Sequence, residues 1–204
     1  MIDLKQKLTI VILGRSGAGK GTQADFVLKR LKRRGAKYLE TGRFLRNLLK
    51  KPNTTTRIGR QVMKSGGLFP AWFAAFTWLK ELIEYGHGDK HLVFDGAPRR
   101  IWEAELIDDV VAWHGRYLPI CVYVKVSEKE AIRRLFLRGR SDDQRIQIYS
   151  RMRFFKKYVM PVIRYYKRHA CLVEVNGEKN PEDVFEEIDR VLLKRLGRKW
   201  PKRS

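Results

Sequence analysis

The chain has 204 residues, of which 44% are hydrophobic and 32% charged, a composition that supports one folded domain and excludes an intrinsically disordered chain. Lys and Arg number 44 against 22 Asp and Glu, a formal charge of +22, which predicts an anionic partner. Two cysteines, Cys121 and Cys171, are too few for a disulfide framework or a four-cysteine zinc site, so we expect both to be buried. The longest apolar run, 69–79, is too short to cross a bilayer, and residues 1–7 lack the pattern of a secretory signal. We therefore expect a cytoplasmic protein with no membrane partner.

Four short apolar runs predict strands that are buried on both faces, and a helical pattern follows each of them. The runs are 7–13, 91–94, 119–126 and 170–175. Strands that alternate with helices of ten or more residues predict crossover connections and a mostly parallel sheet. We expect an α/β fold of three layers.

Two helix starts carry clear local signals. Ser127 with Glu130 three residues later predicts a capping box that opens a helix ending at Arg138. The Asn180-Pro181 pair predicts the start of the last helix, which we expect to end near Gly197.

The most informative motif lies between the first predicted strand and the first predicted helix. Residues 14–22 read Gly-Arg-Ser-Gly-Ala-Gly-Lys-Gly-Thr, in the strand-loop-helix context of a phosphate-binding loop. The glycines let backbone N–H groups turn toward a polyphosphate, and Lys20 supplies a positive charge to its β- and γ-phosphates. A glycine-rich turn without a ligand would explain the glycines but not Lys20 at this spacing. We expect a nucleoside triphosphate to bind through Ser16, Gly17, Ala18, Gly19, Lys20, Gly21 and Thr22.

Residues 19–23, Gly-Lys-Gly-Thr-Gln, resemble the adenylate kinase family of nucleoside monophosphate kinases, and three more segments match in the order of that family. They are Thr41-Gly42 with 44–46, the turn 95–99 (Asp-Gly-Ala-Pro-Arg), and 140–143 (Arg-Ser-Asp-Asp) with Arg151. The resemblance covers nearly the whole chain. It implies a P-loop fold with a five-stranded parallel sheet and a mobile helical insert that binds the monophosphate. It further implies a single kinase domain with a core of 1–40, 87–138 and 142–197, an insert at about 41–86, a minimal lid at about 138–142 and a basic tail at 194–204.

The same resemblance implies the reaction and its residues. The reaction is reversible transfer of the terminal phosphoryl group of ATP to a nucleoside monophosphate, AMP first of all, and it requires two anions to be aligned and neutralised. The catalytic positions implied are Lys20, Arg99, Arg138, Arg140 and Arg151. Arg134 and Lys179 join the phosphate loop in binding ATP. The monophosphate positions implied are Thr41, Gly42, Arg46, Gly96, Arg99 and Glu103. Asp95 is expected to hold Mg²⁺, the implied cofactor, through water, whereas Asp142 and Asp143 are expected to position arginines.

Three departures from the family pattern keep other activities open. Only Gly139 separates Arg138 from Arg140, so the lid is nearly absent and ATP hydrolysis without an acceptor is expected. Arg43 stands where the family has an aspartate. Glu103 replaces the glutamine that reads adenine, and a carboxylate, which only accepts hydrogen bonds, matches guanine better. The alternatives are a related kinase acting on GMP, CMP or UMP, and a basic ATPase associated with nucleic acid.

The phosphate site accounts for only part of the surplus positive charge. A second class of function, nonspecific contact with nucleic acid through the basic surface, therefore stays open. The sequence contains neither an RNA-recognition motif nor a helix with the Asn and Gln residues that contact base edges, which argues against sequence-specific binding. The short-lid members of the family lead us to expect a monomer.

Overall fold

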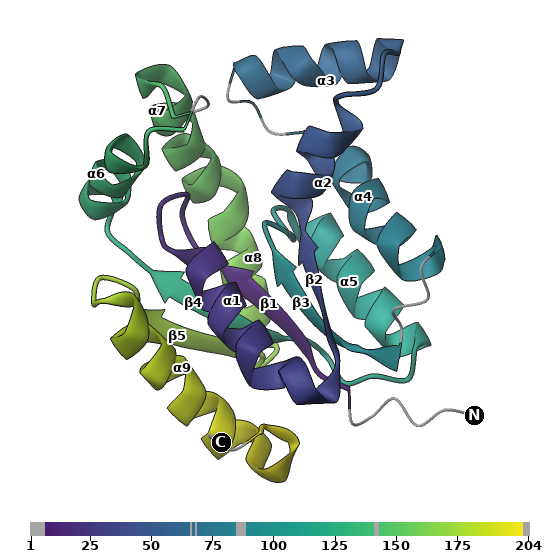
Figure 1. The fold of residues 1–204 in the computed structure, drawn as a ribbon, viewed down its shortest axis with the longest axis vertical. Coiled ribbons are helices and arrows are strands. Elements are labelled where there is room, and N and C mark those ends of the chain that lie inside the picture. The colour runs from purple at the N-terminus through teal and green to yellow at the C-terminus, as the bar shows by residue number, and fades with distance from the viewer. Residues whose placement is uncertain (1–6, 66, 68, 85–88, 141–142, 202–204) are drawn as a thin grey trace.

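The computed structural model describes residues 7–65, 67, 69–84, 89–140 and 143–201. Its centre is a five-stranded sheet in the order β2-β3-β1-β4-β5 (Figure 1). The strands are β1 (Thr9–Leu13), β2 (Ala36–Glu40), β3 (His91–Asp95), β4 (Ile120–Lys125) and β5 (Leu172–Asn176). All four strand pairings are parallel, which confirms the predicted fold class. Because the strands are parallel, every connection between them crosses over through helix.

Helices cover both faces of the sheet (Figure 1). They are α1 (Lys20–Leu31), α2 (Thr41–Leu48), α3 (Thr54–Lys64), α4 (Ala71–Glu84), α5 (Ile101–Trp113), α6 (Glu128–Arg138), α7 (Arg145–Phe154), α8 (Met160–Arg168) and α9 (Pro181–Leu196). Short 3₁₀ turns follow α1 (η2, Lys32–Arg34) and α9 (η5, Gly197–Lys199). One core joins α1, α6, α7 and α9 to the sheet face that carries Ile10 and Ile12. The other joins α4, α5 and α8 to the face that carries Val11 and Leu13.

Helices α2 and α4 share a third, smaller core formed by Leu45, Leu49, Phe69 and Phe73. The second half of α4 belongs to the main core, where Trp78 is fully buried and meets Phe94 of β3 edge to face. Helix α4 therefore anchors the α2–α4 segment to the sheet.

The strand and helix predictions are largely confirmed, with two corrections. Strand β2 was missed, because Ala36–Glu40 carries Lys37 and Glu40 and lies at the edge of the sheet, where its residues are mostly half-buried. Only one of the two hydrogen bonds of the predicted capping box is present. Ser127 Oγ does accept from the Glu130 N–H (3.3 Å), but the Ser127 N–H donates to Glu178 Oε1 (2.9 Å).

Helix α7 continues into α8 through a wider π-helical turn, η4 (Phe155–Val159). Phe155 in this turn is buried. Farther along, the hydroxyl of Tyr165 donates to Asp108 Oδ2 (2.8 Å) and that of Tyr166 to Asp108 Oδ1 (3.3 Å). These bonds tie α8 to α5.

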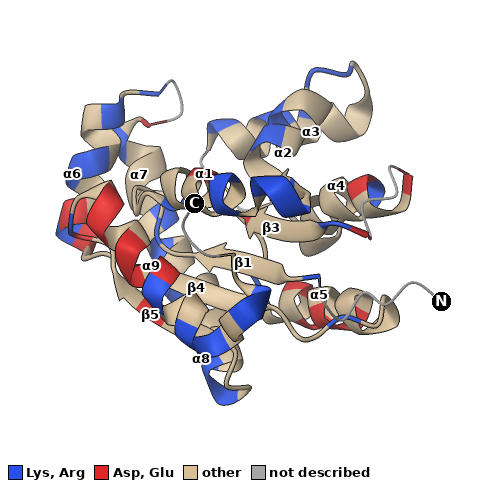
Figure 2. Ribbon diagram, turned by 60° about the horizontal axis from the view of Figure 1, so that its bottom comes forward, with Lys and Arg blue, Asp and Glu red and all other residues tan. Residues whose placement is uncertain are grey.

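Cys121 and Cys171 are buried free thiols, as predicted. No helix in the described part of the chain is long and apolar enough to cross a membrane. Acidic residues gather on α5 and on the first half of α9, whereas Lys and Arg are spread over most other helices (Figure 2).

Candidate active site

The phosphate-binding loop connects β1 to α1 and ends at Gly19, the N-cap of α1, with φ of 83°. A left-handed residue here lets the chain turn abruptly into the helix, a conformation open to glycine at little cost. Gly17 also has positive φ, and a Cβ built on it would lie 2.5 Å from the Ala131 carbonyl oxygen of α6. Its substitution would therefore push the loop away from α6.

Lys20 is folded into this loop, where its Nζ donates to the Arg15 carbonyl oxygen (2.9 Å). Burial lowers its pKa, Asp95 opposes this, and the cations Arg99, Arg138 and Arg151 add to the lowering. The surroundings of Lys20 thus hold more positive than negative charge, an arrangement that a bound polyphosphate would neutralise.

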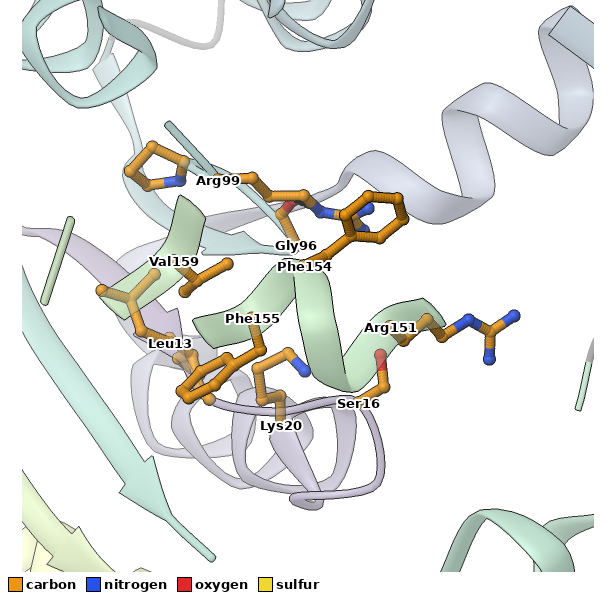
Figure 3. Close-up of a pocket in the computed structure, with 12 residues that line it drawn as sticks. Leu13, Ser16, Lys20, Gly96, Arg99, Arg151, Phe154, Phe155 and Val159 are labelled. Atoms are coloured by element: carbon orange, nitrogen blue, oxygen red, sulfur yellow. Dashed lines mark hydrogen bonds between the residues drawn. The ribbon is translucent and has the colours of Figure 1, made fainter. Parts of the chain in front are cut away.

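Lys20, Arg99 and Arg151 surround one pocket, although they come from α1, the turn after β3, and α7 (Figure 3). Apolar side chains close its other side, among them Phe155, over whose ring Arg15 lies at 4.4 Å. A wider cleft opens next to it. Its charged lining includes Lys20, Asp25, Glu40, Arg43, Asp95, Arg99, Arg134, Arg138 and Arg140.

A buried carboxylate organises the arginines of this cleft. The Asp143 side chain is 0% exposed and accepts from Arg138 Nε and Nη2, both at 2.7 Å, and from Arg151 Nη1 at 2.8 Å. Burial alone would raise the pKa of Asp143, but the bonds from Arg138 and Arg151 outweigh it and lower the pKa. The carboxylate is therefore ionised and fixes two guanidinium groups. Asp142 lies outside the described residues.

Arg99 is held in place at both its side chain and its backbone. Its Nε donates to the Gly96 carbonyl oxygen (2.7 Å), and its N–H donates to Glu103 Oε2 (2.8 Å). Glu103 is only 1% exposed and does not line the cleft described above. Burial raises its pKa, partly offset by the bond from Arg99. In this position Glu103 holds the backbone of Arg99 from the side away from the cleft.

Thr41 and Gly42 begin α2 and lie against the turn after β3. Thr41 is 1% exposed, and its Oγ1 is buried with no hydrogen-bond partner in the structure. Gly42 lets Arg46 fold back, since a Cβ on it would lie 3.2 Å from Arg46 Nη1. Arg46 Nη2 donates to Glu40 Oε1 (3.0 Å). Of the implied monophosphate residues, Gly42, Gly96 and Arg99 line the cleft. Thr41 is buried against Gly96, and Arg46 bonds to Glu40 of the cleft lining.

Asp95 ends β3 beside the phosphate loop, and a Cβ on Gly21 would lie 3.8 Å from its Oδ2. The Tyr38 hydroxyl donates to the same oxygen (3.0 Å). Burial and Asp95 raise the pKa of Tyr38, so the hydroxyl stays protonated and keeps donating. In the described part of the chain no three His, Cys, Asp or Glu side chains form a metal-binding group.

The implied ATP residues continue into a groove beyond the phosphate loop. Arg134 and Lys179 line it together with Gly17, Gly19 and Thr22. Arg134 is fixed there, since its Nε donates to Glu130 Oε1 (2.7 Å) and its Nη1 to the Gly177 carbonyl oxygen (2.8 Å). A planar guanidinium held in this way offers a face on which a base can stack.

Three residues that line the cleft were missed in the sequence analysis, namely Asp25, Tyr38 and Glu40. Also missed were Phe155 in the adjoining pocket and Arg15, which lies over the Phe155 ring. Tyr38 and Asp95 are 57 residues apart, so only the pairing of β2 with β3 brings them together. Glu40 directly precedes the Thr41-Gly42 motif, and that adjacency was the signal available for it.

Known proteins of one family are similar to this chain over most of its length. A family model described as adenylate kinase matches residues 12–171. The adenylate kinase of Thermus thermophilus is 32% identical over 187 residues, which is 90% of this chain and 96% of the relative. The adenylate kinase of Azobacteroides pseudotrichonymphae is 31% identical over 185 residues, 89% of this chain and 95% of the relative. That of Encephalitozoon cuniculi is 31% identical over 183 residues, again 89% of this chain and 96% of the relative.

Proposed function

Because the chain belongs to the adenylate kinase family, we propose that its cleft transfers the terminal phosphoryl group of ATP to AMP, reversibly, giving two ADP. It is a nucleoside monophosphate kinase. The chemistry needs little covalent help from protein, since a monophosphate is already a nucleophile. It needs both phosphates aligned, their repulsion neutralised and water kept away.

On the donor side, the N–H groups of the phosphate loop and Lys20 hold the β- and γ-phosphates. Arg138 and Arg151 reach the transferring group as a pair, because Asp143 fixes both guanidinium groups. Arg140 lines the same cleft. The planar fork of arginine suits the equatorial oxygens of a phosphoryl group in transfer better than the point charge of lysine. The base of ATP lies along Arg134, near Lys179.

On the acceptor side, Arg99 and Arg46 hold the phosphate of the monophosphate. Thr41 Oγ1, buried without a partner, provides a hydrogen-bonding group that the nucleotide can satisfy. Arg99 reaches the acceptor with its backbone and Nε already engaged, so it loses little freedom when the anion binds.

The oxygen donors beside the phosphate loop fit Mg²⁺, which prefers one or two carboxylates and keeps several waters. Asp95 supplies the carboxylate, oriented by Tyr38. When bound with ATP, the ion neutralises charge on the phosphates. Gly21 occupies the position where many phosphate loops carry a hydroxyl ligand, so the contact we propose runs from Asp95 through water.

The observation that carries this proposal is the convergence of Lys20, Arg99 and Arg151 on one pocket (Figure 3). The test is to incubate the protein with ATP and Mg²⁺ and, separately, with AMP, dAMP, CMP, UMP or GMP, following diphosphates by phosphorus NMR. We expect AMP to be the acceptor used, and Arg99→Ala to abolish turnover. Arg190→Ala, at an exposed position of α9, is the matched control and leaves turnover unchanged. A different preferred acceptor points to Glu103 and Arg43. No acceptor at all, with ATP still hydrolysed, overturns the kinase proposal.

Further properties follow from the family and from the composition. We propose a monomer in the cytoplasm, with the α2–α4 segment (about 41–86) as the monophosphate-binding insert and about 138–142 as a minimal lid. Residues 141 and 142, and Lys202 and Arg203 of the basic tail, lie outside the described residues. The surplus charge also favours nonspecific contact with nucleic acid.

A further inference from the structure

One end of the molecule carries a dense group of exposed cations, on the side of the sheet opposite the active site. Lys32, Arg33 and Arg34 lie in η2, just before β2 begins, and Lys194, Arg198 and Lys199 lie at the end of α9 and in η5; all six are exposed. We call these six residues the basic end. The catalytic loops lie at the carboxyl ends of the parallel strands, so the basic end and the cleft are at opposite edges of the sheet.

Direct contacts hold the parts of the basic end together. Arg34 Nη1 donates to the carbonyl oxygens of Lys199 (2.9 Å) and Arg198 (3.4 Å). Lys199 Nζ lies 4.4 Å from the ring centroid of Tyr117, which is 57% exposed in the connection from α5 to β4. Cations from two segments and an accessible aromatic ring thus share one surface.

The acidic side chains of α9 in the described structure do not neutralise this surface. Asp189, on the preceding turns of the helix, is buried and accepts from Arg30 Nη2 (2.8 Å) and Trp200 Nε1 (2.8 Å). The exposed acids of α9 lie in its first half, so the helix changes from red to blue along its length (Figure 2). Cations at a helix C-terminus interact favourably with the helix dipole. One or two cations are enough to interact with the dipole of α9. The dipole therefore does not explain six cations on neighbouring segments.

The neighbourhood of the basic end favours a single strand of nucleic acid over a membrane. Trp113, 83% exposed, ends α5 near Tyr117, but the exposed carboxylate of Asp109 lies one helical turn away on the same face. A flat anionic membrane that reached Trp113 would meet this acid. A flexible single strand can follow the cations and stack a base on Tyr117, which is how proteins bind such strands without sequence preference.

We propose that the basic end is a binding surface for single-stranded RNA or DNA, independent of sequence and separate from the catalytic cleft. Binding occurs through phosphates on the six cations and through stacking on Tyr117. The proposal locates the nucleic-acid contact favoured above, and it does not depend on which acceptor the cleft uses.

The test measures the anisotropy of a fluorescent twelve-residue oligouridylate at several KCl concentrations, with saturating ATP and Mg²⁺ present to fill the cleft. The test variant replaces Lys32, Arg33, Lys194 and Arg198 by Gln. The matched control replaces four exposed cations of the α2–α4 segment, Lys50, Lys51, Arg57 and Lys64, and has the same net charge. Each phosphate that is no longer neutralised on a single strand lowers the slope of log affinity against log salt by about 0.7. The test variant should therefore lose up to about 3 in slope and at least tenfold in affinity at low salt, with kinase activity unchanged.

Three outcomes would overturn the proposal. The wild-type protein could bind no oligonucleotide once ATP fills the cleft, which would assign any binding to the active site. The control variant could lose as much affinity as the test variant, which would make the binding diffuse. Vesicles of phosphatidylserine could bind more tightly than the oligonucleotide, in favour of a membrane. As a second measurement, Tyr117→Ala should weaken binding about tenfold at constant net charge. Because kinase activity is measured in the same samples, failure of this proposal is distinct from failure of the kinase proposal.

Discussion

Replacing Asp143 by Asn should weaken both the fold and catalysis. The carboxylate accepts three hydrogen bonds of 2.7–2.8 Å from Arg138 and Arg151 and has no exposed surface. Removing one partner of a buried ion pair costs about 3–5 kcal/mol because a charge is left without compensation. The Arg138 side chain is 34% exposed and the Arg151 side chain 18%, so both recover some hydration in the variant. We therefore expect a loss of about 3 kcal/mol in the free energy of unfolding.

The kinetic effect follows from the same contacts. With Asn at 143 the guanidinium groups are no longer fixed, and a displacement of about 1 Å in a catalytic group can cost about 100-fold in rate. We expect kcat to fall by about that factor, whereas the KM for AMP changes little. Unfolding in urea and a coupled assay of ADP formation measure the two effects. Asp109→Asn, an exposed position on α5, is the control and should change stability by no more than about 0.5 kcal/mol.

The pH dependence gives the sharpest test of this reasoning. The pKa of Asp143 is lower in the folded protein than in the unfolded chain. The ionised carboxylate therefore contributes its full stabilisation at pH values above the ordinary carboxyl pKa of about 3.9. That stabilisation is lost as the pH falls through the lower pKa of the folded state. The difference in stability between wild type and Asp143→Asn should be constant from pH 7 to about pH 5 and should narrow below about pH 4. A difference below about 0.5 kcal/mol at pH 7, together with an unchanged kcat, would refute the role assigned to Asp143.

Three further predictions concern the acceptor, the metal and the lid. Glu103 accepts from the Arg99 N–H in this structure; if residue 103 turns to the base when a monophosphate binds, Glu103→Gln should raise AMP turnover relative to GMP turnover, because glutamine can donate as well as accept. An unchanged ratio would show that residue 103 only supports Arg99. Tyr38→Phe removes the hydroxyl that orients Asp95 and should raise the Mg²⁺ concentration for half-maximal ATP binding about tenfold, measured by calorimetry; equal values would show that Tyr38 does not act on the metal. With ATP and Mg²⁺ but no acceptor, the short lid should allow slow phosphate release; a rate at background would contradict that expectation.

Much of the fold could be predicted because its signals are local. The phosphate loop needs only a strand, glycines and a lysine in order, and the four predicted strands are continuous apolar runs. Strand β2 could not be found in this way. Its five residues include Lys37 and Glu40 and lie at a sheet edge, so they lack a continuous apolar run and look like a loop until β3 is present beside them.

The candidate site was predicted as a set of residues and not as a set of contacts. The family resemblance indicated Arg99, Arg138 and Arg151, but whether Glu103 faces the nucleotide or the Arg99 backbone depends on how α5 packs. The pairing of Tyr38 with Asp95 arises from sheet order, which no short pattern contains. The expectation that Asp143 positions arginines agrees with its contacts, because a carboxylate among so many cations has few other partners.

The π-helical turn η4 lies in an interval of the chain, from Arg151 to Tyr165, whose number of residues is fixed by the contacts at its two ends. It joins α7, which carries Arg151 toward the cleft, to α8, where Tyr165 and Tyr166 bond to Asp108. Each residue added to a helix rotates the rest of that helix by about 100°. One insertion or deletion between Arg151 and Tyr165 would turn either the arginine from the pocket or the tyrosines from Asp108. Homologous chains that share this geometry can vary freely in the lid and the tail, but this interval should keep its length.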